Sequence, residues 1–116
     1  MAILRLHRTC IKFKWRRLHT QKEKYKILFF GTDDFSLHTL KALHQDFLAG
    51  LSIGQLETCC QSFQKLVPPV KKFSDASSLK VHAWPPEVEV CKQFDLAVVS
   101  SFGQLIPSRI INSFPL

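Results

Sequence analysis

Runs of apolar residues separated by polar turns divide the chain beyond residue 25 into alternating strands and helices. Residues 26–30 (KILFF) are a short apolar run, which predicts a strand buried on both faces. Gly31 ends the run, and Thr32 with the two aspartates after it are residues that commonly begin a helix. Apolar side chains then recur at helical spacing, at Leu37, Leu40, Leu43 and Phe47. Gly50 is expected to end this helix.

The remainder of the chain continues the alternation with weaker signals. We expect a second strand at 54–61, a loop at 62–72, a short helix at 71–78, a third strand at 79–83, a fourth strand at 95–101 and a short helix near 107–111. The fourth strand (DLAVVSS) has the strongest pattern of these, and Gly103 follows it. The alternation predicts an α/β fold with a Rossmann-like parallel sheet, in which the fourth strand packs beside the first.

A ligand site is predicted from this topology, because parallel sheets bind ligands at the carboxyl ends of their strands. Residues 31–35 and 100–106 follow the two strongest predicted strands. Gly31 and Gly103 can equally be ordinary turn glycines. The sequence holds no G-x-G-x-x-G and no G-K-[ST], so neither a dinucleotide-binding fingerprint nor a P-loop is present.

The basic charge is concentrated in a leader, residues 1–25. The chain has a net charge of +7; residues 1–26 hold nine Lys or Arg and one acid, Glu23, whereas residues 27–116 hold seven basic and eight acidic residues. A helical projection places Leu4, Ile11, Trp15 and Leu18 on one side, beside a stripe of basic residues. This pattern is typical of a mitochondrial presequence, with the import machinery as partner and the matrix as destination. A retained RNA-binding arm and a solvated tail are the alternatives.

Other features of the composition narrow the class of protein. No apolar stretch approaches the roughly 20 residues that cross a bilayer, so no stable membrane insertion is expected. The four cysteines form no C-x-x-C pair and are expected to be reduced, partly buried thiols of a non-secreted protein. Cys59 and Cys60 should point to opposite faces of their strand. No metal site is expected, since His82 has no partner at a zinc-ligand spacing.

Three segments of the chain resemble methionyl-tRNA formyltransferases. Residues 26–44 (KILFFGTDDFSLHTLKALH) resemble the opening strand, F-x-G-T-x-D-F turn and helix of that family. Pro69-Val70-Lys71 resembles the P-V-K after its first long loop, and residues 95–107 (DLAVVSSFGQLIP) resemble its fourth-strand segment. After the targeting leader predicted at 1–25, the resemblance implies that residues 26–116 are part of the family's N-terminal, folate-binding domain.

The resemblance also implies an activity and site residues. The activity is formyl transfer from 10-formyltetrahydrofolate to methionyl-initiator tRNA, with no metal. The implied folate pocket is lined, largely through backbone groups, by Phe102, Gly103, Gln104, Leu105 and Ile106. The implied methionyl end lies near Gly31, Thr32 and Phe35. Candidate tRNA contacts are Lys65, Lys71 and Lys72, for which a solvated surface is an equal alternative.

The catalytic Asn-x-His motif of that family does not occur in the sequence, where Asn112 is followed by Ser113. We therefore expect the 116-residue polypeptide to be an N-terminal part of such an enzyme, inactive by itself. A non-catalytic remnant and a fragment of a different 10-formyltetrahydrofolate-using enzyme are the alternatives. We also expect poor folding in isolation, with residues 95–101 as an exposed apolar sheet edge.

Overall fold

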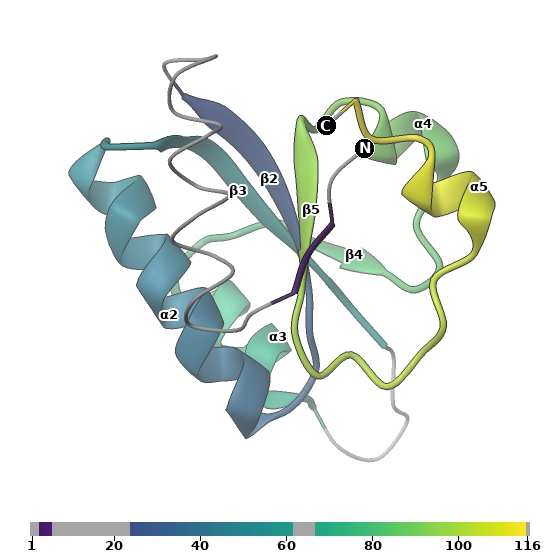
Figure 1. The fold of residues 1–116 in the computed structure, drawn as a ribbon. Helices are drawn as coiled ribbons and strands as arrows, with labels where there is room; N and C mark the ends of the chain where they lie inside the picture. Colours follow the sequence, from purple (N-terminus) through teal and green to yellow (C-terminus); the bar gives the residue numbers. More distant parts are fainter. Residues whose placement is uncertain (1–2, 6–23, 62–66, 116) are drawn as a thin grey trace.

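A computed structural model describes residues 3–5, 24–61 and 67–115 of this chain. The described residues form a five-stranded sheet with the strand order β1-β5-β2-β3-β4, and each neighbouring pair is parallel (Figure 1). The strands are β1 (Ile3–Arg5), β2 (Tyr25–Phe30), β3 (Ile53–Cys60), β4 (Val81–Ala83) and β5 (Leu96–Val99). The helices are α2 (Asp34–Ala49), α3 (Pro69–Ala76), α4 (Val88–Cys91) and α5 (Ser108–Ile111). The predicted α/β fold with a parallel sheet is confirmed.

The pairing of the central strands is the one expected from the sequence. The fourth predicted strand, β5, lies beside the first, β2, with Ile27 opposite Leu96 and Phe30 opposite Val99. The long helix is also confirmed, since α2 begins after Asp33 and ends at Gly50, whose φ of 68° lies in the left-handed region. Gly50 closes the helix because glycine adopts this conformation without a steric penalty.

Two local expectations differ from the structure. The loop expected over 62–72 ends earlier, because α3 already begins at Pro69. A proline suits this position, since the first turn of a helix does not use its backbone N–H groups. The four-residue helix α4 follows the Pro85-Pro86 turn and was not predicted, since four residues are too few to display a helical period.

The N-terminal segment corrects two further expectations. Ile3–Arg5 forms a strand, not part of an amphipathic helix, and pairs in parallel with β5 through Ile3 opposite Ala97 and Arg5 opposite Val99. Residues 6–23 lie outside the described residues. The edge of β5 that was expected to be exposed is therefore covered, and β5 lies between β1 and β2.

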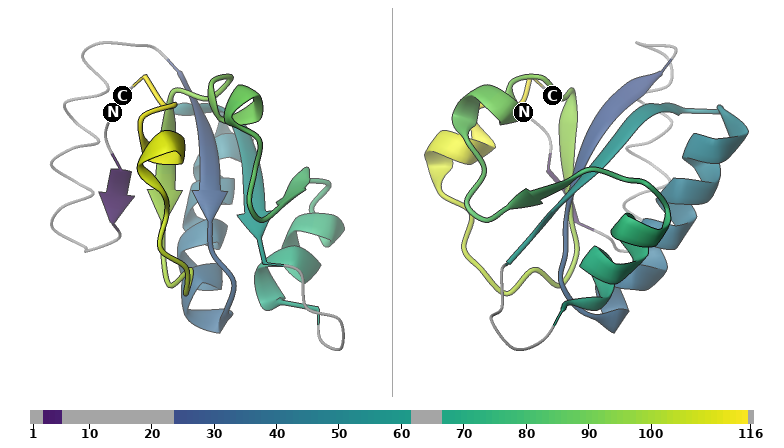
Figure 2. Two further views of the ribbon diagram at one scale, coloured as in Figure 1. Left: turned by 90° about the vertical axis from the view of Figure 1, so that its right-hand side faces the viewer. Right: turned by 180° about the vertical axis from the view of Figure 1, so that it is seen from behind.

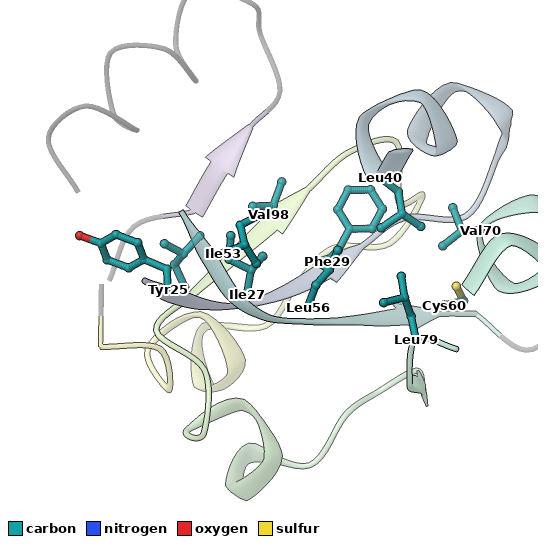
Figure 3. Packing of buried hydrophobic residues seen from close by; sticks show 11 residues of the cluster. Tyr25, Ile27, Phe29, Leu40, Ile53, Leu56, Cys60, Val70, Leu79 and Val98 are labelled. Atoms are coloured by element: carbon teal, nitrogen blue, oxygen red, sulfur yellow. The ribbon is translucent and has the colours of Figure 1, made fainter. Parts of the chain in front are cut away.

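Helices cover both faces of the sheet and create two hydrophobic clusters. α2 and α3 lie on one side of the sheet, and α4 and α5 lie on the other (Figure 1). The first cluster joins side chains of β2, β3 and β5 to Leu40 and Val70 of the two larger helices (Figure 3). The second joins the opposite faces of the same strands to Cys91 and Ile110. Cys60 belongs to the first cluster and Cys59 to the second, so the predicted alternation is confirmed.

Candidate functional site

The carboxyl ends of β2, β3 and β5 lie at one end of the sheet and define the candidate site. The arrowheads of these strands point the same way, toward the N-terminal ends of α2 and α3 and the loop after β5 (Figure 2). Backbone hydrogen bonds join the segments there. The Gly31 N–H donates to the Cys59 carbonyl at 3.4 Å, and the Val70 N–H donates to the Thr32 carbonyl at 3.5 Å. The segments at the end of the sheet that was predicted to bind a ligand are therefore joined to one another by hydrogen bonds.

The turn after β2 is compact because Gly31 lacks a side chain. A Cβ at this position would lie 2.6 Å from Cε1 of Phe29 and 2.9 Å from Cβ of Ser36. Ser36 is fully buried, and its hydroxyl accepts a hydrogen bond from the Thr32 N–H at 3.0 Å and donates to the Asp33 carbonyl at 2.9 Å. Asp33 caps α2 by accepting from the Ser36 N–H at 2.9 Å. Gly31 thus serves close packing between the strand and the helix start.

The turn after β5 contains two residues in the left-handed region, on either side of Phe102. Ser101 has a φ of 46° and Gly103 has a φ of 81°. Glycine tolerates this conformation, whereas a residue with a Cβ typically loses roughly 1–2 kcal/mol in it. The Phe102 ring is 3% exposed and meets Phe30 and Trp84 edge to face, with ring centroids 5.5 and 4.8 Å apart. Packing fixes the position of this ring at the centre of the turn.

The main-chain carbonyl of Phe102 is where the three strand ends meet. The Thr32 hydroxyl, after β2, donates to this oxygen at 3.2 Å. The side-chain amide of Gln61, after β3, donates to the same oxygen at 3.2 Å. Two candidate segments that lie 70 residues apart in the sequence are therefore in direct contact.

The side chains of the predicted folate segment have different surroundings. Phe102 is in the core, and Ile106 is half-buried against the second hydrophobic cluster. Gly103 and Gln104 are exposed, and Leu105 is 94% exposed. Phe35, in the first turn of α2, is 70% exposed. Apolar side chains at both loops therefore face solvent, where a ligand could contact them.

The three candidate lysines also differ. Lys65 lies outside the described residues. Lys71 pairs with Asp75 one turn further along α3, at 2.8 Å, and both side chains are about half exposed. Lys72 is exposed on the same helix. Among the ion pairs of the described residues, Lys71 has a carboxylate partner and Lys72 has none.

The buried thiols are not arranged as nucleophiles. Cys59, Cys60 and Cys91 are buried and form no disulfide within the described residues, and Cys10 lies outside those residues. Burial raises the pKa of Cys60 to about 11, and burial also raises the pKa of Cys59 and of Cys91. Because the thiolate is the reactive form, these groups are inert near neutral pH.

Two contributors to the site were missed in the sequence. Gln61 is the polar residue after the apolar end of β3, so the rule that selected the segments after β2 and β5 would also have selected it. Ser36 stands three residues after Asp33, the spacing at which an N-cap side chain meets a backbone N–H. Its burial was not predicted, because it interrupts the apolar pattern of α2.

The two loops offer binding surface rather than proton-transfer groups. Asp33 and Asp34 are the titratable residues of 31–35 and 100–106, and Asp33 serves as the helix cap. In the described part of the chain, no three His, Cys, Asp or Glu side chains are grouped to hold a metal ion. No helix among the described residues combines the length and apolarity that a membrane crossing requires.

Sequence comparison identifies relatives over most of the chain. Mitochondrial methionyl-tRNA formyltransferase of Rattus norvegicus is 36% identical over 98 residues, covering 82% of this chain and 25% of the relative. The human mitochondrial enzyme is 35% identical over 98 residues, with the same coverage. Methionyl-tRNA formyltransferase of Macrococcus caseolyticus is 35% identical over 96 residues, covering 75% of this chain and 31% of the relative. No protein-family model and no solved structure matches the chain.

Proposed function

Because this chain is related to the methionyl-tRNA formyltransferases over most of its length, and spans about a quarter of the length of its mitochondrial relatives, we propose that it contributes the same activity. The reaction is formyl transfer from 10-formyltetrahydrofolate to the amino group of methionyl-initiator tRNA. The sequence similarity carries this proposal. The contact between the Thr32 hydroxyl and the Phe102 carbonyl supports it, since it joins the two segments that resemble the family's site.

In this proposal, the loop after β5 binds the folate and the turn after β2 binds the methionyl end of the tRNA. The backbone of residues 102–106 lines the folate pocket, with the exposed Leu105 side chain against an apolar part of the donor. The segment Gly31 to Phe35 lies at the methionyl end, and the exposed Phe35 ring offers an apolar contact. Lys71 and Lys72, at the start of α3, contact tRNA phosphates.

A segment exchange tests the activity. Residues 26–116 would replace the matched segment of the rat mitochondrial enzyme, and transfer of labelled formyl to charged initiator tRNA would be measured. We expect the chimera to be active. A matched chimera with Phe35→Ser and Leu105→Ser should keep its fold, since both side chains are exposed, and should bind substrate more weakly. A folded chimera without activity would contradict the proposal.

The 116-residue polypeptide by itself is proposed to be inactive in the same assay. It contains no Asn-x-His, and losing a single oxyanion-stabilising donor commonly costs on the order of 10²–10³ in rate. Formyl transfer that co-purifies with the polypeptide would show that other residues of this chain perform the chemistry.

We also propose that residues 1–25 direct the protein to the mitochondrial matrix. The support is the basic leader, which is free of acids before Glu23, together with relatives that are mitochondrial enzymes. A fusion of residues 1–30 to a fluorescent protein should colocalise with mitochondria. Changing Arg5, Arg8, Arg16 and Arg17 to Glu should abolish import, because the presequence is attracted to acidic receptors and anionic lipid. A cytosolic or nuclear signal from the unchanged fusion would favour the RNA-binding alternative.

A further inference from the structure

We propose that Gln61 and Thr32 are positioning residues that clamp the Phe102 carbonyl and thereby orient the peptide bond between Phe102 and Gly103 in the ligand-binding loop. The assignment of folate as the ligand of this loop rests on the proposed function. The clamp itself rests on the geometry of the three strand ends.

The clamp joins three adjacent strands at one atom. Thr32 follows β2, Gln61 follows β3, and Phe102 lies beyond the end of β5. Because β2 lies between β5 and β3 in the sheet, the Gln61 side chain reaches across a whole strand to the Phe102 oxygen. A carbonyl oxygen has two lone pairs, and two donors at 3.2 Å use both of them.

The peptide plane after Phe102 is the part of the loop that packing alone leaves undetermined. The Phe102 ring is fixed against Phe30 and Trp84. The left-handed conformation of Ser101 persists only where its surroundings over-determine it, whereas Gly103 adopts this conformation freely. The two hydrogen bonds to the carbonyl supply that determination. Gln61 also lies against Gly103, with its Nε2 3.8 Å from the place where a Cβ would stand.

The orientation of the carbonyl determines what the loop presents to a ligand. In a trans peptide the C=O and N–H bonds point in opposite directions, and the Phe102–Gly103 bond is not a cis bond. Since the carbonyl points back to the ends of β2 and β3, the Gly103 N–H points away from them, on an exposed residue. The clamp therefore presents a fixed backbone donor that an acceptor atom of the folate can use.

The first experiment measures the clamp directly in the full chain. Thr32→Val and Gln61→Met are nearly isosteric and each remove one donor. Each should move the ¹³C resonance of the Phe102 carbonyl and the ¹⁵N resonance of Gly103, and the double variant should move them further. Thr32→Ser retains the hydroxyl and should leave both resonances nearly in place. Gln55→Met is the matched glutamine control, since Gln55 bonds to Glu57 instead.

The second experiment measures the consequence in the rat-enzyme chimera. Gln61→Met and Thr32→Val should each raise the KM for 10-formyltetrahydrofolate roughly five- to tenfold, the loss expected for one well-placed hydrogen bond. In Gln61→Met, which lies outside the segment proposed to bind the methionyl end, the KM for charged tRNA should change little. Thr32→Ser keeps the hydroxyl donor, so its folate KM should stay close to that of the unchanged chimera.

The two measurements separate the clamp from the proposed function. Unmoved Phe102 and Gly103 resonances in either folded single variant would overturn the clamp. Moved resonances with an unchanged folate KM would overturn its role in ligand binding. An inactive wild-type chimera would overturn the proposed function, and the resonances would still decide the clamp.

Discussion

Two single residues, Gly31 and Gly103, each follow a buried strand and are glycine for different reasons. Gly31 is required by close packing against Phe29 and Ser36, whereas Gly103 is required by its backbone conformation. An ordinary turn glycine would need neither property as strictly.

Gly31→Ala is expected to lower the free energy of unfolding by about 1–3 kcal/mol, the usual cost of overpacking. The reason is the 2.6 Å approach to the Phe29 ring, which the buried strand cannot relieve. Gly54→Ala is the matched control, because its Cβ would meet only the Lys24 side chain closely, at 3.2 Å. Urea unfolding of both variants checks this expectation. Equal stability of the two variants would contradict it.

Buried thiols give the fold a predictable response to alkaline pH. Burial raises the pKa of Cys60 from the ordinary 9.0 to about 11. The stability that the protonated Cys60 thiol contributes is therefore fully present below about pH 9. It is lost as the pH rises toward 11, because the unfolded chain then releases a proton that the folded chain retains. We expect the free energy of unfolding to fall by on the order of 2 kcal/mol across this window. Unfolding of Cys60→Ala across the same pH series should show a smaller decline, and an identical decline would count against this cause.

At the scale of elements, caps and side-chain pairs determine where helices and strands end. Asp33 begins α2, and Asp46 holds the turn after the helix by accepting from the N–H groups of Ser52 and Ile53 at 2.9 and 3.0 Å. The short strand β4 is joined to β3 by His82, whose Nε2 lies 2.6 Å from Oε1 of Glu57. Elements of three or four residues depend on such contacts, since their own backbone pairing is small.

Asp33→Ala is expected to destabilise the chain by about 0.5–2 kcal/mol, since the first turn of α2 then loses its side-chain acceptor. Asp33→Asn keeps an acceptor oxygen and should retain most of the stability. Asp34→Ala is the control for the charge near the helix N-terminus, which is worth less when exposed. Thermal unfolding would rank the three variants. A loss in Asp34→Ala as large as that in Asp33→Ala would point to charge rather than capping.

At the scale of the whole molecule, the covered outer edge of β5 is the main departure from expectation. Leu96, Ala97 and Val98 of β5 are buried. An open edge at this strand would expose unpaired backbone N–H and C=O groups beside an apolar core. Ile3–Arg5 covers this edge. Ile3–Arg5, within the leader proposed to direct import, thus also belongs to the sheet.

Leu4→Pro is expected to release this edge, because proline removes a backbone donor and restricts pairing in the middle of β1. Backbone amides of β5 that face β1 should then exchange with solvent at least tenfold faster, and the chain should self-associate. Hydrogen exchange and sedimentation check both outcomes. Thr9→Pro, in the leader beyond β1, is the control. Protection of β5 that is equal in both variants would mean that β1 does not cover the edge.

The sequence by itself determined the features that depend on local pattern. Buried strands appear as apolar runs, α2 appears as an apolar period with Asp33 and Gly50 at its ends, and the alternation of both predicts the parallel sheet. The end of the sheet that carries the candidate site also followed, because parallel strands share one carboxyl end. The resemblance carried by residues 26–44 and 95–107 pointed to the family of the relatives.

Only the tertiary structure decided which separate segments meet. No local pattern predicts that the Gln61 side chain reaches across β2 to Phe102, because this hydrogen bond depends on the strand order and on a main-chain carbonyl 41 residues away. The pairing of β1 with β5 joins residues more than 90 positions apart. The basic charge pattern of the leader does not predict this pairing. Ser36 interrupts an apolar period and is nevertheless buried, because the turn at Gly31 supplies its hydrogen bonds. Long-range pairing of backbone and polar groups completes the site, and sequence periodicity does not encode it.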